Sequence, residues 1–193
     1  MISVKKLTYS INKKTLFSGL EFEVTSGNLF QILGSNGSGK TTLLKILSGI
    51  TIPTKGELSF TGLPKKVFLG HKIPIKDYLT NLQNFCLLNE NSSIEHFFKY
   101  CDLVHLKVTK SMLSSNLSFG QKKKLLLSKI FQKSYDILFL DEPFVGLDVQ
   151  TVTLLKNRIH ELQRNGSVIF LTSHQESIQG DVIIDLDQGS ILR

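Results

Sequence analysis

Several residue types that would point to a particular class of protein are scarce or missing. The 193-residue sequence has no tryptophan, four prolines and two cysteines. Cys86 and Cys101 show neither a CxxC nor a metal-ligand spacing, which argues against a disulfide framework and favours a reducing compartment with thiols that serve packing. The longest apolar runs, Ile137–Leu140 and Val168–Leu171, fall far short of the roughly 18 residues that span a membrane. We therefore expect a chain that does not cross a bilayer.

An apolar segment behind the charged N-terminus is also missing, so we expect no secretory signal and a protein that stays where it is made. Arginine is scarce too, since 20 of the 23 basic residues are lysines, against 16 acidic residues and a formal net charge of +7. Lysine is less suited than arginine to bidentate contacts with phosphates or bases. The charge fits nucleic acid, an anionic membrane, a polyanionic ligand or simply a lysine-rich composition, and does not decide the function.

The order of apolar segments predicts an α/β fold. An apolar content of 41% suffices for one core in a chain of this length, so we expect a single domain over residues 1–193. Val4–Tyr9 and Leu20–Val24 predict an N-terminal antiparallel hairpin. Further strands are expected at Leu29–Leu33, Ile137–Leu140, Val168–Leu171 and, as the last one, near Val182–Leu186. Helical segments alternate with these strands, which predicts a mostly parallel sheet covered on both faces. Residues 77–115 are polar, irregular and helical in pattern, and with the following helix they form an expected helical subdomain over residues 77–135.

A glycine-rich loop carries the first functional motif. Gly34 to Thr41 fit the pattern GxxxxGK followed by Ser or Thr, between an apolar strand and an amphipathic helix. Glycines let backbone N–H groups point at phosphates, and the helix adds its positive end. Lys40 would reach the β/γ oxygens, and the Thr41 hydroxyl would bind Mg²⁺. The candidate nucleotide-binding residues are Gly34, Ser35, Asn36, Gly37, Ser38, Gly39, Lys40, Thr41 and Thr42.

Two acidic residues form the second motif. Asp141 and Glu142 follow the apolar strand Ile137–Leu140, and ligands of parallel sheets bind at the carboxyl ends of strands. Asp141 is a candidate for the Mg²⁺ shell, and Glu142 for the base that positions and deprotonates an attacking water. No Asn-Lys-x-Asp motif occurs, which disfavours a small GTPase.

A third set of motifs makes the pattern specific. Leu117–Gln121 reads LSFGQ and lies roughly 20 to 25 residues before Asp141. It resembles the LSGGQ signature of the nucleotide-binding subunits of ABC transporters, a P-loop NTPase family. Gly146–Asp148 resembles the D-loop of that family, and His174 its switch histidine. The resemblance covers essentially the whole chain.

This resemblance implies an ATPase that uses ATP and Mg²⁺ and acts as a homodimer with two ATPs between its subunits. It implies that His174 contacts the γ-phosphate and that Asp148 is the D-loop acid. The residues implied to contact the ATP of the opposite subunit are Ser118, Phe119, Gly120 and Gln121.

The sequence departs from the family at several positions. The aromatic residue that stacks on adenine should fall near Ile11, and the nearest aromatic is Tyr9. Lys72 stands where many relatives have a glutamine that touches Mg²⁺, and an ammonium group cannot coordinate a cation. Either the metal contact is lost or Lys72 contacts phosphate. Lys122–Lys124 follow the signature, and we expect a solvated helix face there, with added positive potential near ATP as the alternative.

Several fragments resemble one branch of the family, the ATP-binding subunits of the haem exporter used in cytochrome c maturation. They are Leu16–Leu20, Gly34–Leu44, Leu69–His71, Phe144 and Thr172–Gln175. The resemblance implies integral membrane partners of the CcmB and CcmC type, and a place on the cytoplasmic face of the inner or plasma membrane, or on the matrix face in an organelle. It implies no direct nucleic-acid partner.

We expect no haem on this chain, because His71 and His105 lack any CxxCH or axial-pair context. Three alternatives remain. The chain would be the ATPase of another small-molecule exporter if residues 77–115 fit a different partner. A soluble ABC ATPase acting on nucleic acid or ribosomes usually has two cassettes or a long coiled coil, and this chain has one phosphate loop and no heptads. A non-catalytic cassette would explain the departures at Ile11 and Lys72.

Overall fold

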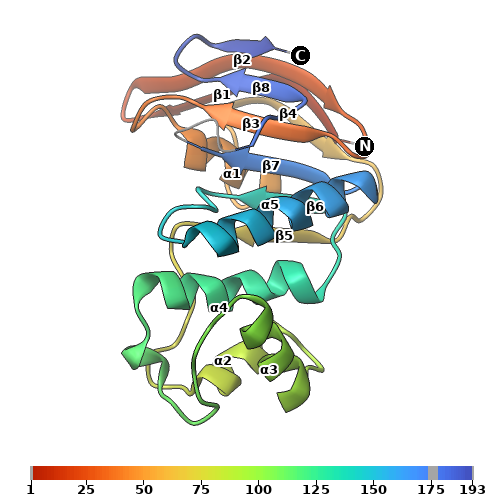
Figure 1. Cartoon of the computed structure of the whole chain (residues 1–193). Coiled ribbons are helices and arrows are strands. Elements are labelled where there is room, and N and C mark those ends of the chain that lie inside the picture. Colours follow the sequence, from red (N-terminus) through yellow and green to blue (C-terminus); the bar gives the residue numbers. More distant parts are fainter. Residues whose placement is uncertain (1, 174–177, 193) are drawn as a thin grey trace. The chain divides into compact units, whose positions relative to one another are not determined.

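The structure is a computed structural model that describes residues 2–173 and 178–192 (Figure 1). The chain forms two compact units. The first comprises Met1–His71, Tyr135–Pro143 and Glu161–Arg193, and the second comprises Lys72–Ser134 and Phe144–His160.

A three-stranded antiparallel sheet forms part of the first unit. Its order is β2-β1-β4, with β1 at Ile2–Ile11, β2 at Lys14–Val24 and β4 at Lys55–Phe60. Asn12 and Lys13 join β1 to β2 with φ angles of 48° and 64°, the left-handed conformations that a two-residue hairpin turn requires. The predicted N-terminal hairpin is therefore confirmed, and it is longer than its apolar segments suggested.

The second sheet of this unit has six strands in the order β5-β6-β7-β3-β8-β9, and all neighbours are parallel except β8 and β9. The strands are β3 (Leu29–Leu33), β5 (Lys66–Leu69), β6 (Ile137–Leu140), β7 (Val168–Thr172), β8 (Val182–Asp185) and β9 (Ser190–Leu192). Every residue of β6 and β7 is buried, so both faces of the sheet are covered there, as predicted. The prediction that the strand near Val182–Leu186 is the last one is wrong, because the chain turns back and β9 pairs antiparallel with β8.

Helix α1 (Lys40–Ser48) connects the two sheets through one hydrophobic core. Its four buried apolar side chains are Leu43, Leu44, Ile46 and Leu47. They pack with inward-facing residues of both sheets. In the six-stranded sheet these include Phe30 of β3 and Phe170 of β7, whose stacked rings have centroids 4.7 Å apart. Burial of each such side chain stabilises the fold by about 1.5–3 kcal/mol. The core thereby fixes α1, and with it the loop that precedes α1, against the parallel sheet.

The second unit is helical. It contains α2 (Asn81–Leu88), α3 (Ile94–Leu103), the 3₁₀ turn η1 (Ser114–Asn116), α4 (Phe119–Gln132) and α5 (Val149–Arg164) as far as His160. The helical pattern predicted for residues 77–115 is confirmed by α2 and α3. A separate core of this unit forms around Phe85, Phe97 and Tyr100, which interact edge to face and in tilted pairs.

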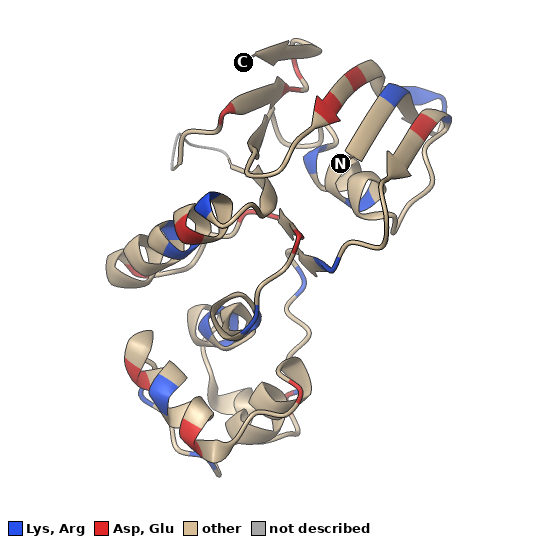
Figure 2. Cartoon of the chain, turned by 90° about the vertical axis from the view of Figure 1, so that its right-hand side faces the viewer, with Lys and Arg blue, Asp and Glu red and all other residues tan. Residues whose placement is uncertain are grey.

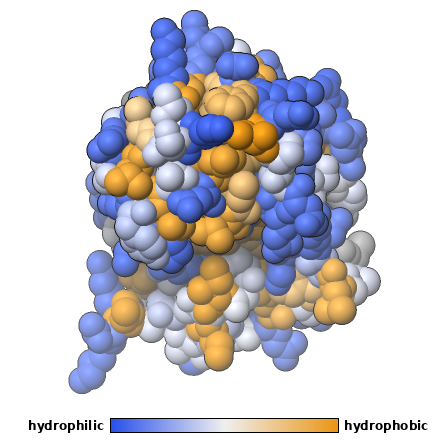
Figure 3. All heavy atoms as spheres, turned by 90° about the horizontal axis from the view of Figure 1, so that it is seen from below, coloured by the Kyte–Doolittle hydropathy of each residue, from blue (hydrophilic) through white to orange (hydrophobic). Residues whose placement is uncertain are grey.

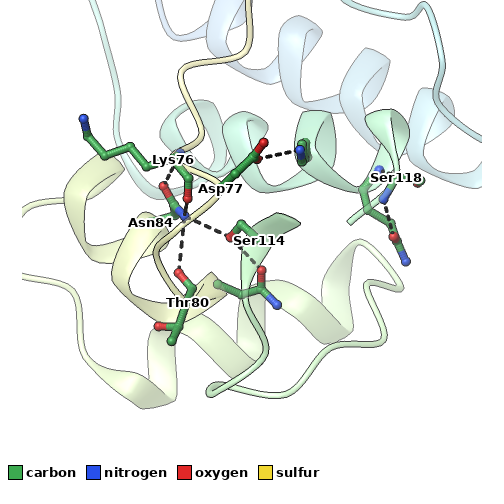
Figure 4. Close-up of polar contacts among 9 residues, drawn as sticks. Lys76, Asp77, Thr80, Asn84, Ser114 and Ser118 are labelled. Atoms are coloured by element: carbon green, nitrogen blue, oxygen red, sulfur yellow. Dashed lines mark hydrogen bonds and ion pairs between the residues drawn. The ribbon is translucent and has the colours of Figure 1, made fainter. Parts of the chain in front are cut away.

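A buried polar network fixes the entrance to α4 (Figure 4). The Asn84 amide accepts a hydrogen bond from Lys76 N at 2.9 Å, and it donates to Lys76 O and to Ser114 Oγ, both at 2.9 Å. Ser114 Oγ in turn donates to Asn81 Oδ1 at 2.8 Å. A buried amide needs such partners. The network therefore connects the segment before α2 to Ser114, the first residue of η1, which lies four residues before Ser118.

Charged residues of both signs are mixed on the surface. Figure 2 shows basic and acidic positions side by side on the strands of the three-stranded sheet and along α5. This mixing favours the lysine-rich composition, rather than one dedicated anion-binding face, as the reason for the net charge. Within residues 2–173 and 178–192, none of the helices combines the length and the hydropathy that a transmembrane span requires.

Candidate nucleotide-binding site

The predicted phosphate loop and the acidic pair lie at the same edge of the parallel sheet. The loop follows β3, and Asp141 follows β6, while β7 lies between these two strands. Because parallel strands point the same way, their carboxyl ends meet at one edge, where ligands of such sheets bind. All of these elements belong to the first unit.

Two glycines give the loop its shape. Gly34 has a φ of 149°, and a Cβ on it would lie 2.5 Å from Ser38 Oγ. Gly39 has a φ of 106°, and a Cβ there would lie 3.2 Å from Leu16 Cβ. Any side chain at either position would be strained and crowded. The buried hydroxyl of Ser38 has no hydrogen-bond partner within the part of the chain that the structure describes.

The first turn of α1 is not capped by a side chain. Its N-cap residue, Gly39, has none to offer, and the first turn contains no acidic residue. By contrast, α2, α3 and α4 each begin with a complete capping box. The first N–H groups of a helix have no partner inside the helix, and they carry its positive partial charge. The start of α1 is therefore suited to binding an anion such as phosphate.

Lys40 turns back over the loop. Its buried Nζ donates to Gly34 O at 2.7 Å and to Ser35 O at 3.0 Å. Ser35 is itself held by Asp187, whose carboxylate accepts from Ser35 N at 2.6 Å and from Ser35 Oγ at 2.9 Å. Sequence reasoning missed Asp187, because it lies in the turn between β8 and β9 and belongs to no motif.

Thr41 and Asp141, the two predicted Mg²⁺ ligands, lie in direct contact. Thr41 Oγ1 is 2.8 Å from Asp141 Oδ2 and 3.0 Å from Asp141 Oδ1. Asp141 is 4% exposed, and its backbone N–H donates to Leu69 O of the neighbouring strand β5 at 2.8 Å. A hydroxyl and a carboxylate supply the hard oxygen ligands that Mg²⁺ prefers, so this pair fits the ion.

Glu142 adopts an unusual backbone conformation. Its φ of 49° lies in the left-handed region, which costs a residue with a side chain roughly 1–3 kcal/mol. Its N–H donates to Thr172 Oγ1 at 2.8 Å, and Thr172 Oγ1 donates to Asp141 Oδ1 at 2.8 Å. Thr172 was not among the predicted site residues, although a hydroxyl at the end of an apolar strand was visible in the sequence. His174 lies outside the described residues.

The signature motif lies in the second unit, at the start of α4. Ser118 is the N-cap residue, and its Oγ accepts from Gln121 N at 3.3 Å while Gln121 Oε1 accepts from Ser118 N at 2.9 Å. Phe119 is 48% exposed. A Cβ on Gly120 would lie 2.4 Å from Gly146 O, so the predicted D-loop passes directly against this glycine. Only glycine permits that approach.

The solvated face expected at Lys122–Lys124 is wrong for two of the three residues. Lys122 is partly exposed and pairs with Asp77 at 2.6 Å. Lys123 and Lys124 are buried, and Lys123 Nζ donates to Val145 O at 2.8 Å. The physical reason is helical periodicity, since three consecutive residues cover about 200° of a helix and cannot all face water. Their stems pack in the protein while their charged ends reach polar groups.

Asp148 connects the predicted D-loop to α4. Its Oδ2 lies 2.6 Å from Lys124 Nζ, and its Oδ1 accepts from both Thr151 N and Thr151 Oγ1 at 2.9 Å. The hydrogen bond from Lys124, followed by those from Thr151, holds the pKa of Asp148 well below its usual range. Lys124 also donates to Val104 O at 2.8 Å. The lysine thus links three segments of the second unit.

Three further residues singled out in the sequence are exposed or take part in packing. Ile11 is 49% exposed at the end of β1, and the half-buried Tyr9 ring stacks on Phe17 with centroids 6.3 Å apart. Lys72 is exposed on the segment after β5.

The fold and the site define an ATP-binding subunit of the ABC type. The model of the family described as "ABC transporter" matches residues 17–145, and the chain belongs to this family of ATPases. Curated relatives carry a more particular name. A protein of Idiomarina loihiensis named "Cytochrome c biogenesis ATP-binding export protein CcmA" is 33% identical over 91% of this chain and 86% of its own length. The protein of that name from Escherichia coli K12 is 31% identical over 91% of this chain and 89% of its own length.

Solved structures share the fold. The ATP-binding subunit of an ABC transporter matches with a TM-score of 0.81 at 22% identity, covering 96% of this chain and 85% of that one. A putative ABC transporter ATP-binding protein from Pyrococcus furiosus also gives 0.81, at 21% identity and 97% and 98% coverage. A dimeric ATP-binding cassette in a post-hydrolysis state with ADP and Pi gives 0.77, at 20% identity and 100% and 97% coverage.

Proposed function

We propose that this chain is the ATP-hydrolysing subunit of a CcmA-type transporter complex, which serves haem export or cytochrome c biogenesis. The observation that carries the proposal is the contact between Thr41 and Asp141 beside the uncapped start of α1. It brings a hydroxyl, a carboxylate and helix N–H groups without a side-chain cap to one edge of the sheet, an arrangement suited to hydrolysis of a bound nucleotide. The name shared by the curated relatives supports the particular pathway.

In this proposal the loop residues Gly34–Thr42 bind the ATP phosphates, and Lys40 leaves its loop carbonyls for the β/γ oxygens. Thr41 and Asp141 would hold Mg²⁺, and the bound ion would neutralise part of the phosphate charge. Glu142 positions the attacking water and accepts its proton. His174 contacts the γ-phosphate.

A second copy of the chain would complete the site. Residues Ser118–Gln121 of one copy would meet the ATP held by the other, with Asp148 in the adjacent D-loop. The capping box uses the Gln121 N–H and a lone pair of the Ser118 hydroxyl. Among the described residues this hydroxyl donates no hydrogen bond, so its hydrogen suits an outside acceptor. The dimeric form of one structure with this fold supports the arrangement.

The helical unit offers a surface for a membrane partner. Exposed apolar side chains on it include Leu87 of α2 and Phe98 and Leu103 of α3. Figure 3 shows apolar residues interspersed with polar ones on the face of the molecule seen from below. We propose integral membrane subunits of the CcmB and CcmC type as the partners, at the cytoplasmic or matrix face of the membrane, with haem bound elsewhere in the complex.

The hydrolytic role is tested with Glu142→Gln, which keeps the shape of the side chain but cannot accept a proton. We expect ATP to stay bound, phosphate release to fall at least about a hundredfold, and a dimer to accumulate in size-exclusion chromatography with light scattering. The control is Glu57→Gln on β4, which changes an exposed carboxylate outside the site. Unchanged phosphate release by Glu142→Gln would remove Glu142 from the role of base.

The transport role is tested by affinity purification of the tagged chain from detergent-solubilised membranes, followed by mass spectrometry. We expect integral membrane transporter subunits to co-purify. The measurement is repeated with Leu87→Glu and Phe98→Glu, which place charges on the exposed apolar residues and should reduce the yield of the partners. Recovery of the chain on RNA or ribosomes, with no membrane subunits, would contradict the proposal.

A further inference from the structure

A single buried hydroxyl lies between the two acidic residues of the site. Thr172 is the last residue of β7, the strand between β6 and β3, and it has no exposed surface. The four residues before it, Val168–Leu171, are all apolar and buried. A polar group at such a position costs free energy unless it is fully hydrogen-bonded.

The hydrogen bonds of Thr172 go to both acidic residues. Its Oγ1 accepts the backbone N–H of Glu142 at 2.8 Å and donates its own hydrogen to Asp141 Oδ1 at 2.8 Å. A threonine hydroxyl has one donor hydrogen, and here that hydrogen is used on a carboxylate, where hydrogen bonds are strong. The hydroxyl therefore fixes the backbone of one acid and the side chain of the other.

The bond to Asp141 restrains its carboxylate from the side of β7. Thr41 Oγ1 of α1 lies 2.8 Å from Asp141 Oδ2 and 3.0 Å from Oδ1, while Thr172 Oγ1 donates to Oδ1. Without Thr172 the contacts from Thr41 would remain, but the bond from β7 that opposes rotation about the Cβ–Cγ bond would be lost. Thr172 thus helps to hold the carboxylate in the orientation that faces Thr41 Oγ1, the other atom suited to Mg²⁺.

The bond to Glu142 supports a strained conformation. A φ of 49° is unfavourable for a residue with a Cβ, and it persists only where the surroundings impose it. The Glu142 N–H points to Thr172, and this contact orients the peptide from which the Glu142 side chain leaves the sheet edge. Because the Glu142 side chain extends from this peptide, a rotation of the peptide would displace the carboxylate. A displacement of about 1 Å is enough to slow catalysis strongly.

We propose that Thr172 is a positioning residue for ATP hydrolysis: its hydroxyl orients the Mg²⁺-binding carboxylate of Asp141 and fixes the backbone from which Glu142 reaches the attacking water. The inference rests on the proposed roles of those two residues. Thr172 is fully buried and its hydroxyl is engaged by Glu142 and Asp141, so its removal should slow the chemical step more than it weakens ATP binding.

The test compares Thr172→Val, which keeps the branched shape and removes the hydroxyl, with Thr172→Ser, which keeps the hydroxyl. We expect Thr172→Val to lower kcat about ten- to a hundredfold, to change KM for ATP less than about threefold, and to raise the Mg²⁺ concentration needed for half-maximal rate. Thr172→Ser should restore kcat to within about threefold of the wild type.

Thr8→Val is the matched control. Thr8 Oγ1 also accepts a backbone N–H, that of Gly19 at 3.0 Å, but in the three-stranded sheet away from the site. It should lower the midpoint of thermal unfolding without changing kcat, because it removes a structural hydrogen bond only. If Thr172→Val does not fold, Thr172→Ser and Thr172→Ala form the comparison, since both lose the γ-methyl group and only one loses the hydroxyl.

Wild-type kcat in Thr172→Val, or equal kcat values in the serine and alanine variants, would overturn the inference. Glu142→Gln is measured in the same assay. An inactive Glu142→Gln beside a fully active Thr172→Val leaves the proposed function intact and removes the role of Thr172. An active Glu142→Gln removes the proposed hydrolytic role itself.

Discussion

Helices α1 and α4 both begin at a motif of the ATPase family, but their first turns are arranged differently. The first turn of α1 follows Gly39 and has no side-chain cap, whereas that of α4 is closed by the Ser118 and Gln121 capping box. The N–H groups that lack a side-chain cap lie where we propose that phosphate binds. At α4 the capping box provides a hydrogen-bond acceptor for one N–H group of the first turn, so the start of this helix is held by the second unit's own side chains.

Each of these helices contains a buried lysine, and the two lysines differ in the groups that accept their hydrogen bonds. Lys40 donates to the neutral carbonyl oxygens of Gly34 and Ser35. Lys124 donates to Val104 O and also pairs with the carboxylate of Asp148 at 2.6 Å. A cation held by neutral groups gains strongly from an incoming anion, while a cation already paired with a carboxylate gains little. This difference supports the proposed phosphate-binding role of Lys40 and indicates a structural role for Lys124.

The largest effect is expected for Lys40→Ala, which removes the cation arranged for phosphate. The dissociation constant for ATP should rise at least about a hundredfold, because several charge-assisted hydrogen bonds are lost. Isothermal titration calorimetry measures it, with Lys45→Ala, an exposed lysine on the same helix, as the control. Wild-type affinity in Lys40→Ala would contradict the phosphate-loop assignment.

Gly120→Ala tests whether the start of α4 packs directly against the backbone at Gly146. Alanine in a helix is ordinarily favoured over glycine by about 1 kcal/mol. Here its Cβ would lie 2.4 Å from Gly146 O, so we expect the free energy of unfolding to fall by about 2–3 kcal/mol. Urea unfolding followed by circular dichroism measures this. Gly189→Ala, where a Cβ would meet nothing within 4 Å but the φ of 64° disfavours a side chain by about 1 kcal/mol, is the comparison for backbone strain without a clash. A stabilised Gly120→Ala would mean that the two segments do not touch.

Lys124→Met tests the structural lysine. It keeps an apolar stem of similar length but leaves the Val104 carbonyl without its donor, so we expect a loss of about 1–3 kcal/mol in stability. The matched control is Lys122→Met, which removes a partly exposed ion pair with Asp77 and should cost less than about 1 kcal/mol. Equal losses in the two variants would remove the distinction between these neighbouring lysines.

The same variant has a predicted pH dependence. The pKa of Asp148 is lowered in the folded state, chiefly by Lys124, so this carboxylate stabilises the fold above its unfolded pKa of about 3.9. That contribution is lost as the pH falls through this value toward the lower pKa of the folded state. The stability difference between wild type and Lys124→Met should therefore narrow from about pH 5 downward. Chemical unfolding at pH 7 and at pH 4 checks this, and a difference that widens in acid would contradict it.

The last comparison is within the second unit and concerns its two thiols. Cys86 is exposed, while Cys101 is buried, and burial, followed by the charge of Asp102, raises the pKa of the Cys101 thiol to about 12. Because only the thiolate reacts, we expect Cys101 in Cys86→Ser to react with a disulfide reagent at pH 8 at least about a hundredfold more slowly than Cys86 in Cys101→Ser. Urea should abolish the difference. Equal rates in the native state would mean that the helical core opens readily.

Much of the candidate nucleotide-binding site at the edge of the parallel sheet could be predicted from the sequence. Gly34 to Thr41 and Asp141 belong to contiguous motifs that follow apolar strands, and the parallel arrangement of those strands brings them together. The cap of α4 was also implicit in a serine followed three residues later by a glutamine. Asp187 and Thr172 could not be assigned in this way, because their partners lie on other strands or turns far away in the sequence.

The sequence by itself determined the family, most of the strand and helix order, and the residues proposed to bind phosphate, because short-range motifs carry that chemistry in consecutive positions. Only the tertiary structure decided what the remaining polar residues do. Whether Lys123 and Lys124 face water depends on the segments packed against α4. Whether the Thr172 hydroxyl acts on Asp141 depends on β7 lying beside β6. A polar side chain takes its role from its partners, and those partners are chosen by the pairing of strands and the packing of helices rather than by neighbours along the chain.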